Sequence, residues 1–335
     1  MDNIFIKVDE KEYGPVTLEE FKSLAKEGSV ATEDLIRSED LDDWVEAGQV
    51  NELKKLFANS NGNNGSHQGK LYAVASGKGG VGKTVLTSSI GVALASMGSD
   101  VILVDGDFGG ANLHTCMGIL EPEYTFYDFY TLQKESLSEI LLDTLVENLR
   151  IISGACGTLG LANPKYFQKQ RLIRELKKLP ADTVFLDLGA GSSYNIIDLF
   201  MLADEKLLII TPEPTSVYEA FGFLKVCLMR ELNHRLKDFP RVLEIIAKEE
   251  INKPGKAQLT IADSLQEVKK ISKKAFEIFE DVLDGFSPKL ILNQIREPDE
   301  LKEGKAIQAA AIELLSIHVE YLGYISYDDE VKKAV

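Results

Sequence analysis

The sequence predicts an α/β protein in which a mostly parallel, doubly wound sheet follows a small α+β domain. After residue 71, short apolar runs alternate with helical stretches, as in sheets whose strands are joined by helices. Before residue 58, the chain has strand and helix patterns of its own. Residues 59–70 are rich in Asn, Gly and Ser, which is typical of a flexible linker. We therefore predict domains at 1–58 and 71–335.

The first domain begins with a strand at residues 4–8, where apolar and polar side chains alternate. Residues 12–15 contain Gly and Pro and predict a turn. Thr17 and Glu20 have the spacing of a capping box, which predicts the start of a helix. Gly28 is expected to end this helix.

Three pieces of this domain carry a resemblance. Tyr-Gly-Pro-Val-Thr-Leu-Glu-Glu-Phe starts at Tyr13, Asp-Leu-Ile follows at residues 34–36, and Asp-Asp-Trp-Val-Glu-Ala surrounds Trp44. This pattern resembles the second type of GYF domain, an adaptor that takes proline-rich peptides on an aromatic surface. The resemblance implies a protein partner for residues 1–58, with Tyr13 and Trp44 as contact residues. The alternative is that both rings belong to the core of a small domain.

Strand-like runs are predicted in the second domain at residues 71–75, 101–104, 149–153, 183–188, 206–211, 288–293 and 320–325. Residues 83–97 and 262–283 are predicted helices. Ligands of such sheets bind at the carboxyl ends of the strands, so the polar residues that follow the strands are the candidate site.

The stretch from Gly77 to Thr84 fits the phosphate-binding pattern G-x-x-x-x-G-K-[ST] and lies between a predicted strand and a predicted helix. Its glycines let backbone N–H groups turn towards phosphate oxygens, and the helix N-terminus adds partial positive charge. We expect Lys83 to reach the outer phosphates and the Thr84 hydroxyl to ligate Mg²⁺. The expected nucleotide contacts are Gly77, Gly79, Gly80, Val81, Gly82, Lys83, Thr84 and Val85.

Lys78 is an additional lysine inside this loop. Two neighbouring ammonium groups repel each other unless a polyanion lies between them, so Lys78 turns either to solvent or to phosphate. The sequence K-G-G-x-G-K-T resembles the deviant Walker A motif of the MinD/ParA ATPases. That resemblance implies a domain of the P-loop NTPase type. It also implies that Lys78 acts in catalysis with Lys83 by reaching across a dimer interface to the partner's nucleotide.

Acidic residues follow two further strands. Asp105 and Asp107 come after the run at 101–104, and Asp187 precedes a loop that contains Gly191. Near phosphates, a carboxylate can orient the attacking water or hold Mg²⁺. The resemblance implies that Asp107 positions the hydrolytic water, whereas Asp105 lies nearer the metal. It further implies that Asp187 holds Mg²⁺ through water and that the Gly191 N–H approaches the γ-phosphate. The alternative is a pair of ordinary solvated turns.

Asn293 lies at the end of a later strand. In the family an Asn at this place hydrogen-bonds the adenine, since an amide has both a donor and an acceptor. Tyr321, Tyr324 and Tyr327 suggest the tyrosine cluster of bacterial tyrosine kinases, which share the deviant motif. Packing of a strand and a turn explains these tyrosines equally well.

The composition argues against several other classes of protein. The 335-residue chain has a net charge of −16, so binding to DNA is not favoured. Its three cysteines include no C-x-x-C, which argues against a disulfide framework or an iron–sulfur site and indicates a reducing cytoplasm. No apolar run reaches the length of a membrane span. A basic run contains Lys269, Lys270, Lys273 and Lys274, either as a solvated face or as a contact for membrane or nucleic acid.

The loops after the acidic strands are similar to those of the MinD/FlhG branch. This implies an ATP- and Mg²⁺-dependent switch that homodimerises on ATP, responds to an activating protein and positions a division site, flagellum or other polar assembly. The expected location is the cytoplasm, with peripheral attachment to membrane or pole as an extension. MinD-type proteins usually continue past the base loop into an amphipathic tail, and this chain ends at Val335, so membrane attachment stays open. The alternatives are a ParA-like partitioning ATPase and an adaptor with weak ATPase activity.

Overall fold

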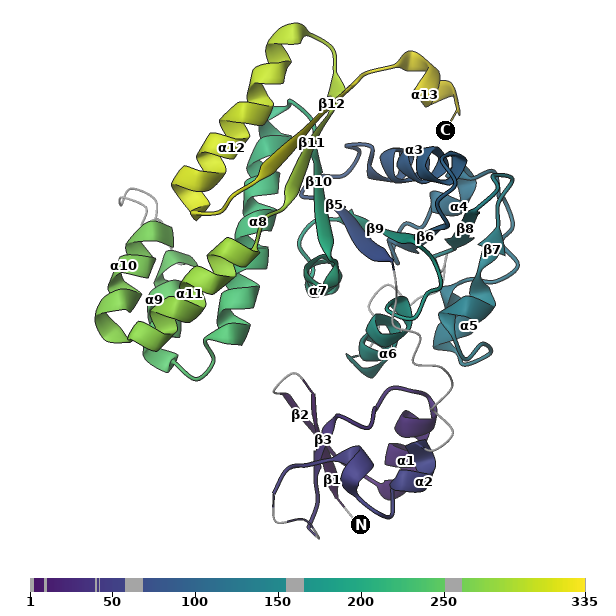
Figure 1. Cartoon of the computed structure of the whole chain (residues 1–335), viewed down its shortest axis with the longest axis vertical. Helices are drawn as coiled ribbons and strands as arrows, with labels where there is room; N and C mark the ends of the chain where they lie inside the picture. Colours follow the sequence, from purple (N-terminus) through teal and green to yellow (C-terminus); the bar gives the residue numbers. More distant parts are fainter. Residues whose placement is uncertain are drawn as a thin grey trace.

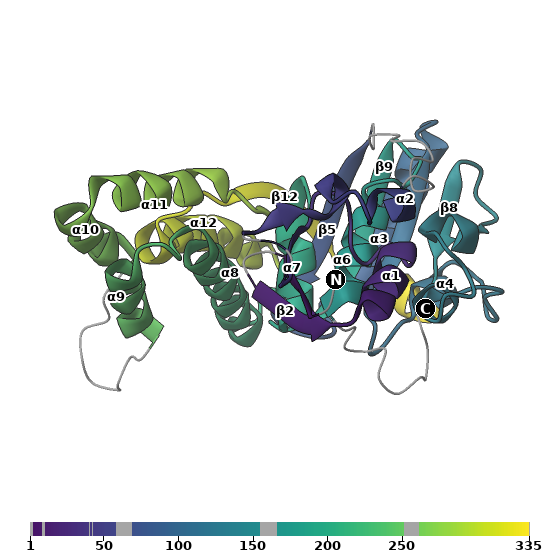
Figure 2. The same cartoon turned by 90° about the horizontal axis from the view of Figure 1, so that it is seen from below.

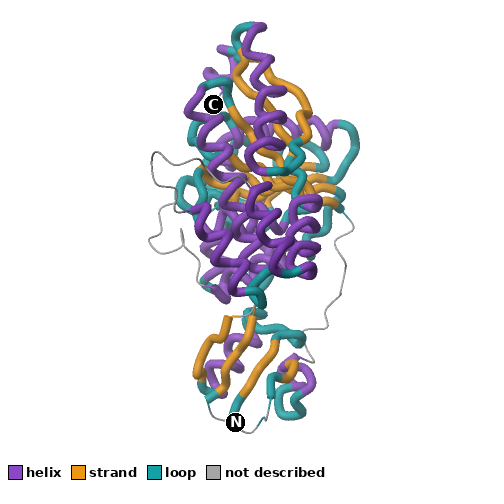
Figure 3. Tube along the Cα trace, turned by 90° about the vertical axis from the view of Figure 1, so that its left-hand side faces the viewer, coloured by secondary structure: helices purple, strands orange, loops and turns teal. Residues whose placement is uncertain are grey.

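The computed structural model describes residues 3–8, 11–39, 41, 43–57, 69–154, 166–250 and 261–334. These residues form two separate sheets (Figure 1). The N-terminal sheet has four strands in the order β2-β1-β3-β4, and the second has eight in the order β12-β11-β10-β5-β9-β6-β8-β7. The small domain lies at one end of the molecule (Figure 3).

The small domain contains β1 (Ile4–Val8), β2 (Lys11–Val16), α1 (Leu18–Lys26), β3 (Leu35–Arg37), β4 (Val45–Glu46), η1 (Ala47–Gln49) and α2 (Lys54–Phe57). The predicted capping box of α1 is confirmed. The Glu20 N–H donates to the Thr17 hydroxyl at 3.2 Å, and the Thr17 N–H donates to the Glu20 carboxylate at 2.7 Å. Phe21 is fully buried under the sheet beside Ile4 and Ile36.

The turn predicted at residues 12–15 is wrong, because these residues belong to β2. The pairing of β2 with β1 shifts register between Ile4 and Ile6, so an irregularity in the ladder accommodates the Gly and Pro that suggested a turn. Trp44 is half-buried, and the Arg37 guanidinium lies 5.0 Å from the centre of its ring. Trp44 is therefore not part of the fully buried core.

The large sheet contains β5 (Lys70–Ser76), β6 (Val101–Gly106), β7 (Leu142–Asp143), β8 (Leu149–Ile152), β9 (Thr183–Ala190), β10 (Glu205–Ile210), β11 (Lys289–Ile295) and β12 (Glu320–Ser326). All its strand pairs are parallel except the pair of β7 and β8. Every strand predicted in this domain is confirmed within two residues. Strand β7 was not predicted, because two residues are too few to show a periodicity.

The helices of this domain are α3 (Lys83–Ser96), α4 (Leu113–Cys116), α5 (Phe126–Tyr130), α6 (Tyr166–Leu176), α7 (Tyr194–Leu202), α8 (Pro214–Arg235), α9 (Pro240–Glu250), α10 (Ile261–Ile271), α11 (Lys273–Gly285), α12 (Lys302–Leu315) and α13 (Asp329–Ala334), with short 3-10 turns η2 (Leu137–Ile140) and η3 (Pro298–Leu301). Helices α9, α10 and α11 project to one side of the sheet (Figure 2). Within the described ranges, no helix combines the length and the apolar character that a bilayer crossing needs.

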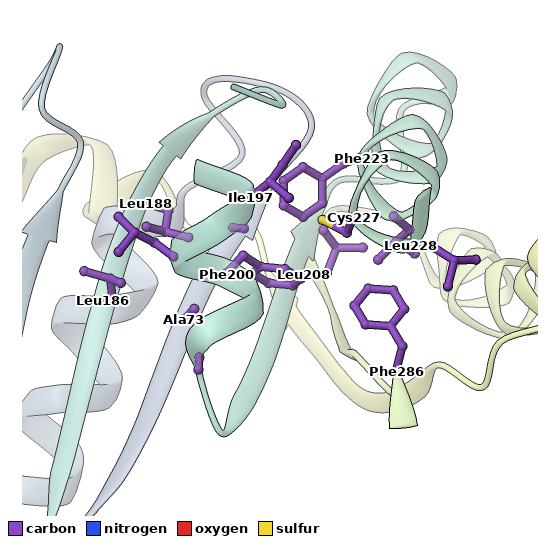
Figure 4. Close-up of a cluster of buried hydrophobic side chains, with 14 of the residues drawn as sticks. Ala73, Leu186, Leu188, Ile197, Phe200, Leu208, Phe223, Cys227, Leu228 and Phe286 are labelled. Atoms are coloured by element: carbon purple, nitrogen blue, oxygen red, sulfur yellow. The ribbon is translucent and has the colours of Figure 1, made fainter. Parts of the chain in front are cut away.

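Hydrophobic clusters cover both faces of the large sheet, as expected for a doubly wound fold. Along β9, Leu186 and Leu188 belong to the larger cluster, whereas Phe185 belongs to the smaller cluster beneath α3. Figure 4 shows Leu186 and Leu188 with Phe200 of α7 and Phe223 of α8 in the larger cluster. The rings of Phe200 and Phe223 meet edge to face at 5.0 Å. This packing fixes the carboxyl ends of the strands relative to α7 and α8.

The prediction of one helix over residues 262–283 is wrong. The segment forms α10 and α11, which are interrupted at Ser272. Ser272 has an extended backbone, and its hydroxyl accepts a hydrogen bond at 3.3 Å from the N–H of Ala275. A serine that caps a new helix in this way ends the preceding helix, although the apolar spacing along the sequence continues across the break.

Candidate nucleotide-binding site

The residues predicted to form the site come together at one edge of the large sheet. The parallel strands β5, β6, β9, β10 and β11 all end there, because their carboxyl ends point the same way (Figure 1). Asp105 of β6 and Asp187 of β9 are direct register partners across neighbouring strands. The loop after β5 lies beside them, since β5 pairs with β9.

The loop after β5 leads directly into α3, as predicted. Gly82 has a φ of +90°, and a Cβ atom there would lie 2.5 Å from the side-chain nitrogen of Asn293. Only glycine fits this position. The next residue, Lys83, is buried, and its Nζ donates to the Ser76 hydroxyl at 3.1 Å. Burial lowers the pKa of Lys83, and the charges of Asp187 and Asp107 partly oppose this effect.

Asp105 is fully buried and is held by the backbone. Its carboxylate accepts hydrogen bonds from the N–H groups of Asp107 at 3.2 Å and Leu113 at 3.0 Å. Burial raises the pKa of Asp105 to about 7, the Leu113 hydrogen bond opposes this, and the nearby charge of Asp187 adds to it. Asp105 therefore orients the start of the loop that contains Asp107.

Asp187 is almost fully buried beside the start of α3. Burial raises its pKa to about 6, whereas a hydrogen bond with the Thr84 side chain and the charge of Lys83 lower it. The Thr87 hydroxyl, one turn further along α3, lies 3.4 Å from the same carboxylate. Thr87 and Ser76 were not predicted as site residues. Thr87 lies one turn after Thr84, and Ser76 directly precedes the predicted loop.

Asp107 is more exposed and faces the loop after β9. Its Oδ1 accepts hydrogen bonds from the N–H groups of Gly109 at 3.2 Å and Gly110 at 3.0 Å. A Cβ atom at Gly189 would lie 3.1 Å from the same oxygen, so a glycine there allows the two loops to approach. A cleft of about 70 Å³ lies beside this contact, lined by residues of both loops and of α7.

Lys78 has two partners within its own chain. Its ammonium is ion-paired with the Glu213 carboxylate and donates to the Thr215 hydroxyl at 3.0 Å. Glu213 and Thr215 follow β10 and begin α8. They were not predicted as site residues, although their position after a strand of the same sheet was a usable signal.

Asn293 and Gly191 contact the loop after β5 rather than open solvent. The Asn293 side chain donates to the Val81 carbonyl at 2.8 Å, and the Gly191 N–H donates to the Ser76 carbonyl at 3.2 Å. Gln294, which was not predicted, donates to the Gly80 carbonyl at 3.2 Å and has a φ of +62°. The expected contacts of Asn293 with adenine and of Gly191 with phosphate stay predictions.

Two of the three tyrosines near the C-terminus have local partners, and Tyr324 is 52% exposed. Tyr321 packs against α12 beside Gly304. The Tyr327 hydroxyl donates to Asp329 at 3.0 Å, and the Arg296 guanidinium lies 3.6 Å from the centre of the Tyr327 ring. These contacts favour the packing interpretation of the cluster over the kinase interpretation.

The residues around Asp187 fit a magnesium ion that phosphate oxygens help to bind. Thr84 and Asp187 supply a hydroxyl and a carboxylate, which are oxygen ligands of the kind Mg²⁺ takes. Within the described part of the chain, no three His, Cys, Asp or Glu side chains come together as a metal site. A divalent ion at this place would therefore depend on the nucleotide and on water for its remaining ligands.

Sequence comparison decides between the possible nucleotide-binding families. Residues 72–335 match the CobQ/CobB/MinD/ParA nucleotide binding domain. The chain belongs to this family. Residues 5–53 match GYF domain 2. A GYF-type region and a MinD/ParA domain are therefore both recognised in the sequence.

Individual relatives agree with this membership. The chain is 28% identical over 271 residues to the antiactivator FleN of Pseudomonas aeruginosa, covering 80% of this chain and 78% of FleN. It is 25% identical over 267 residues to the septum site-determining protein MinD of Bacillus subtilis, covering 79% of each. The match to MinD of Synechocystis is 32% identical but covers 45% of this chain and 56% of that protein.

Solved structures show the same fold. The cell division ATPase MinD of Pyrococcus furiosus has a TM-score of 0.50 at 20% identity and covers 79% of this chain and 86% of its own. A ParA family ATPase from Chlorobium tepidum has a TM-score of 0.51 at 14% identity, covering 79% of this chain and 88% of its own. The MinD/ParA domain therefore has the fold that the sequence predicted.

One further residue of this MinD/ParA domain positions the site. Phe108 follows Asp107 directly and is buried. Its ring meets Phe126 at 5.3 Å and Tyr130 at 6.1 Å, both edge to face, on α5. This contact anchors the loop that contains Asp107 to a helix. An aromatic residue next to the acid was the available signal in the sequence.

Proposed function

We propose that the protein is an ATP-dependent, dimerising switch ATPase that positions a cellular structure. Its relatives FleN and MinD are named as an antiactivator and as a septum site-determining protein, which supports a role in placing a division site, a flagellum or another polar assembly. The observation that carries the proposal is the grouping of Lys83, Asp187 and Asp107 around one phosphate-binding loop.

Each of these residues has a role that its environment supports. Lys83 is a buried cation that forms no ion pair with a carboxylate among the described residues, so its ammonium suits the outer phosphates. Thr84 and Asp187 would hold Mg²⁺, with Asp105 behind them. Mg²⁺ held by these residues would offset the negative charge of the phosphates. Asp107, the more exposed acid, is placed to orient the attacking water.

The dimer part of the proposal rests on the surface next to the loop. Lys78 lies at this surface, one-third exposed. Two large aromatic side chains nearby, Tyr194 at the start of α7 and Tyr218 near the start of α8, are 71% and 80% exposed. Exposed aromatic residues of this kind are enriched at protein interfaces. A second subunit facing this surface would bring its Lys78 to the nucleotide, and the nucleotide's charge would be paired fully only in the dimer.

The N-terminal domain, an activating protein and the place of action extend this proposal. We infer that residues 1–58 are an adaptor domain for a protein partner, joined by a linker at 59–70 to the ATPase domain at 71–335. An activating protein would stimulate the slow hydrolysis that resets the dimer. The protein would work in the cytoplasm, with attachment at a membrane surface or cell pole as part of its cycle.

The test is the mass of the protein in solution with Mg-ATP or Mg-ADP. Wild type is expected to dimerise with Mg-ATP and to stay monomeric with Mg-ADP. Lys83→Ala should lose nucleotide binding, Lys78→Ala should bind nucleotide without turnover, and Asp107→Ala should stay a dimer with little hydrolysis. Lys302→Ala, on exposed α12, is the matched control and should behave as wild type. A monomeric wild type that hydrolyses ATP rapidly would contradict the proposal.

A further inference from the structure

The small domain rests on α6 of the ATPase domain through specific contacts (Figure 1). The rings of Tyr13 and Phe167 lie 5.3 Å apart. The Arg174 guanidinium donates to the Gly28 carbonyl at 2.8 Å and to the Asp34 carboxylate at 2.6 Å. One aromatic pair and one forked arginine therefore join the two parts of the chain.

The Arg174 guanidinium contacts a buried carboxylate of the small domain rather than an exposed one. Asp34 is only 8% exposed, and its carboxylate also accepts a hydrogen bond from the Ala31 N–H at 2.7 Å. Burial raises the pKa of Asp34, and Arg174 opposes this. Gly28, the other acceptor, is the second residue after the end of α1. A buried carboxylate left without Arg174 would be an unpaired charge, so the site is made for a cation.

Phe167 and Arg174 are seven positions apart on α6, which places both on one face, separated by two turns or about 10 Å. Phe167 packs against the hydrophobic core of the small domain. The surface of the small domain thus contacts a helix. It binds an aromatic side chain and, two turns later on the same helix, an arginine side chain. An extended proline-rich segment does not have this spacing.

We propose that Tyr13, Asp34 and the Gly28 carbonyl form a helix-binding site, which α6 fills within the chain. A partner that fits this site is an amphipathic helix with an aromatic residue at one position and an arginine seven positions later. Such a helix competes with α6 for the small domain. The proposal goes beyond the switch ATPase function, because it concerns how the small domain selects a partner.

The other faces of α6 connect this site to both loops of the nucleotide site. Arg171 is buried and donates to the carbonyls of Phe129 at 2.9 Å and Glu135 at 2.8 Å, around the helix that anchors Phe108. Lys169 is ion-paired with Asp198 on α7, the helix after the loop of Asp187. Burial alone would raise the pKa of Asp198, but hydrogen bonds from Arg230 and Lys169 outweigh it and lower the pKa. Helix α6 therefore contacts the two helices, α5 and α7, that flank the loops of Asp107 and Asp187.

A free helix must compete with α6 for the site on the small domain. A ligand within the same chain acts at an effective concentration in the millimolar range, so a free helix binds poorly until the internal contact is broken. Arg174→Glu breaks it, since two carboxylates then face each other in a buried place. This change alters no hydrogen bond within the small domain. Lys177→Glu makes the same charge change on an exposed residue just beyond α6 and is the matched control.

The test measures binding of a labelled synthetic peptide with the sequence of residues 166–178 to the full-length protein. It is expected to bind Arg174→Glu about tenfold or more tightly than wild type and Lys177→Glu. The radius of gyration from small-angle scattering should rise only in Arg174→Glu. Fluorescence of Trp44, the single tryptophan, checks that the small domain stays folded.

Equal peptide affinity for all three proteins, or an unchanged radius of gyration in Arg174→Glu, would overturn the proposal. Binding of a deca-proline peptide in place of the α6 peptide would overturn it too, in favour of a proline-rich ligand. Phe167→Ala provides a second variant that removes the aromatic contact without touching the buried acid. None of these readouts depends on ATP turnover, so failure here is distinct from failure of the proposed ATPase cycle.

Discussion

At the scale of single residues, the ion pair of Lys78 and Glu213 decides how readily the loop lysine leaves its own chain. Glu213 is 60% exposed and Lys78 33% exposed, so solvent screens much of their attraction. An exposed pair of this kind contributes about 0–1 kcal/mol. Lys78 is thus held in place within the subunit, but weakly enough to be withdrawn by a stronger anion.

This balance gives a prediction for Glu213→Gln. The change removes the internal partner of Lys78, so ATP-dependent dimerisation should occur at up to about fivefold lower protein concentration, in line with a contribution of about 1 kcal/mol. Analytical ultracentrifugation across a concentration series measures this. Glu219→Gln, further along α8, serves as the control. A weaker dimer in Glu213→Gln would show instead that Glu213 acts across the interface.

At the scale of elements, α5 supports the loop of Asp107 through an aromatic cluster. Phe126, Phe129 and Tyr130 pack together, and Phe108 enters the cluster from the loop. The hydroxyl of Tyr130 is buried without a hydrogen-bond partner among the described residues, and burial raises its pKa. The cluster is thus held by ring packing, together with the contact of Arg171 with Phe129.

Phe108→Ala should therefore disconnect the loop from α5. Truncation of a buried phenylalanine costs about 3 kcal/mol or more of the free energy of unfolding. We expect ATP turnover to fall while nucleotide binding persists, because the Phe108 ring packs against α5 and the phosphate loop follows β5. Urea unfolding, nucleotide titration and turnover measure the three effects. Tyr127→Ala, on the exposed side of α5, should leave stability, nucleotide binding and turnover unchanged. A normal turnover in Phe108→Ala would mean that Asp107 is positioned by its backbone contacts alone.

The junction of α10 and α11 depends on a single cap. The Ser272 hydroxyl satisfies the Ala275 N–H at the start of α11, so Ser272→Ala should cost about 1 kcal/mol of the free energy of unfolding. Ser272→Asp should retain the cap and most of the stability. Denaturant unfolding of the three proteins compares them. Equal stability of the alanine and aspartate variants would indicate that packing of the two helices, not the cap, sets the break.

At the scale of the whole molecule, the net charge predicts that the protein does not bind polyanions such as DNA. The net charge is −16, and the basic run at the same junction is already partly engaged. The Lys269 ammonium lies 4.7 Å from the centre of the Phe276 ring, and Lys273 is 3.5 Å from Glu277. Glu277 offsets part of this local positive charge, and the net negative charge of the chain opposes the approach of a polyanion.

We therefore expect no retardation of duplex DNA in a gel at near-physiological salt, with or without Mg-ATP. Replacing Lys269, Lys270, Lys273 and Lys274 by Gln should change nothing. A known ParA-type DNA-binding protein provides the positive control. A shift that weakens steeply with salt and disappears in the Gln variant would contradict this and favour the partitioning interpretation.

Much of the molecule follows from local sequence. The strands of the large sheet are apolar runs that only a buried parallel strand accommodates, and Thr17 with Glu20 defines the start of α1. The phosphate loop was predicted because glycines, a lysine and a threonine at fixed spacing have one common use. Where a polar residue competes with periodicity, as at Ser272, local pattern was insufficient.

The sequence by itself determined the fold class, the phosphate loop and the acids at the strand ends, since each is a property of a few consecutive residues. Only the tertiary structure decided that Lys78 pairs with Glu213, that Phe108 joins α5 and that Arg174 reaches Asp34. These partners are far apart in the chain. Their contacts depend on the order of the parallel strands and on where the small domain lies, and no periodicity along the sequence encodes either.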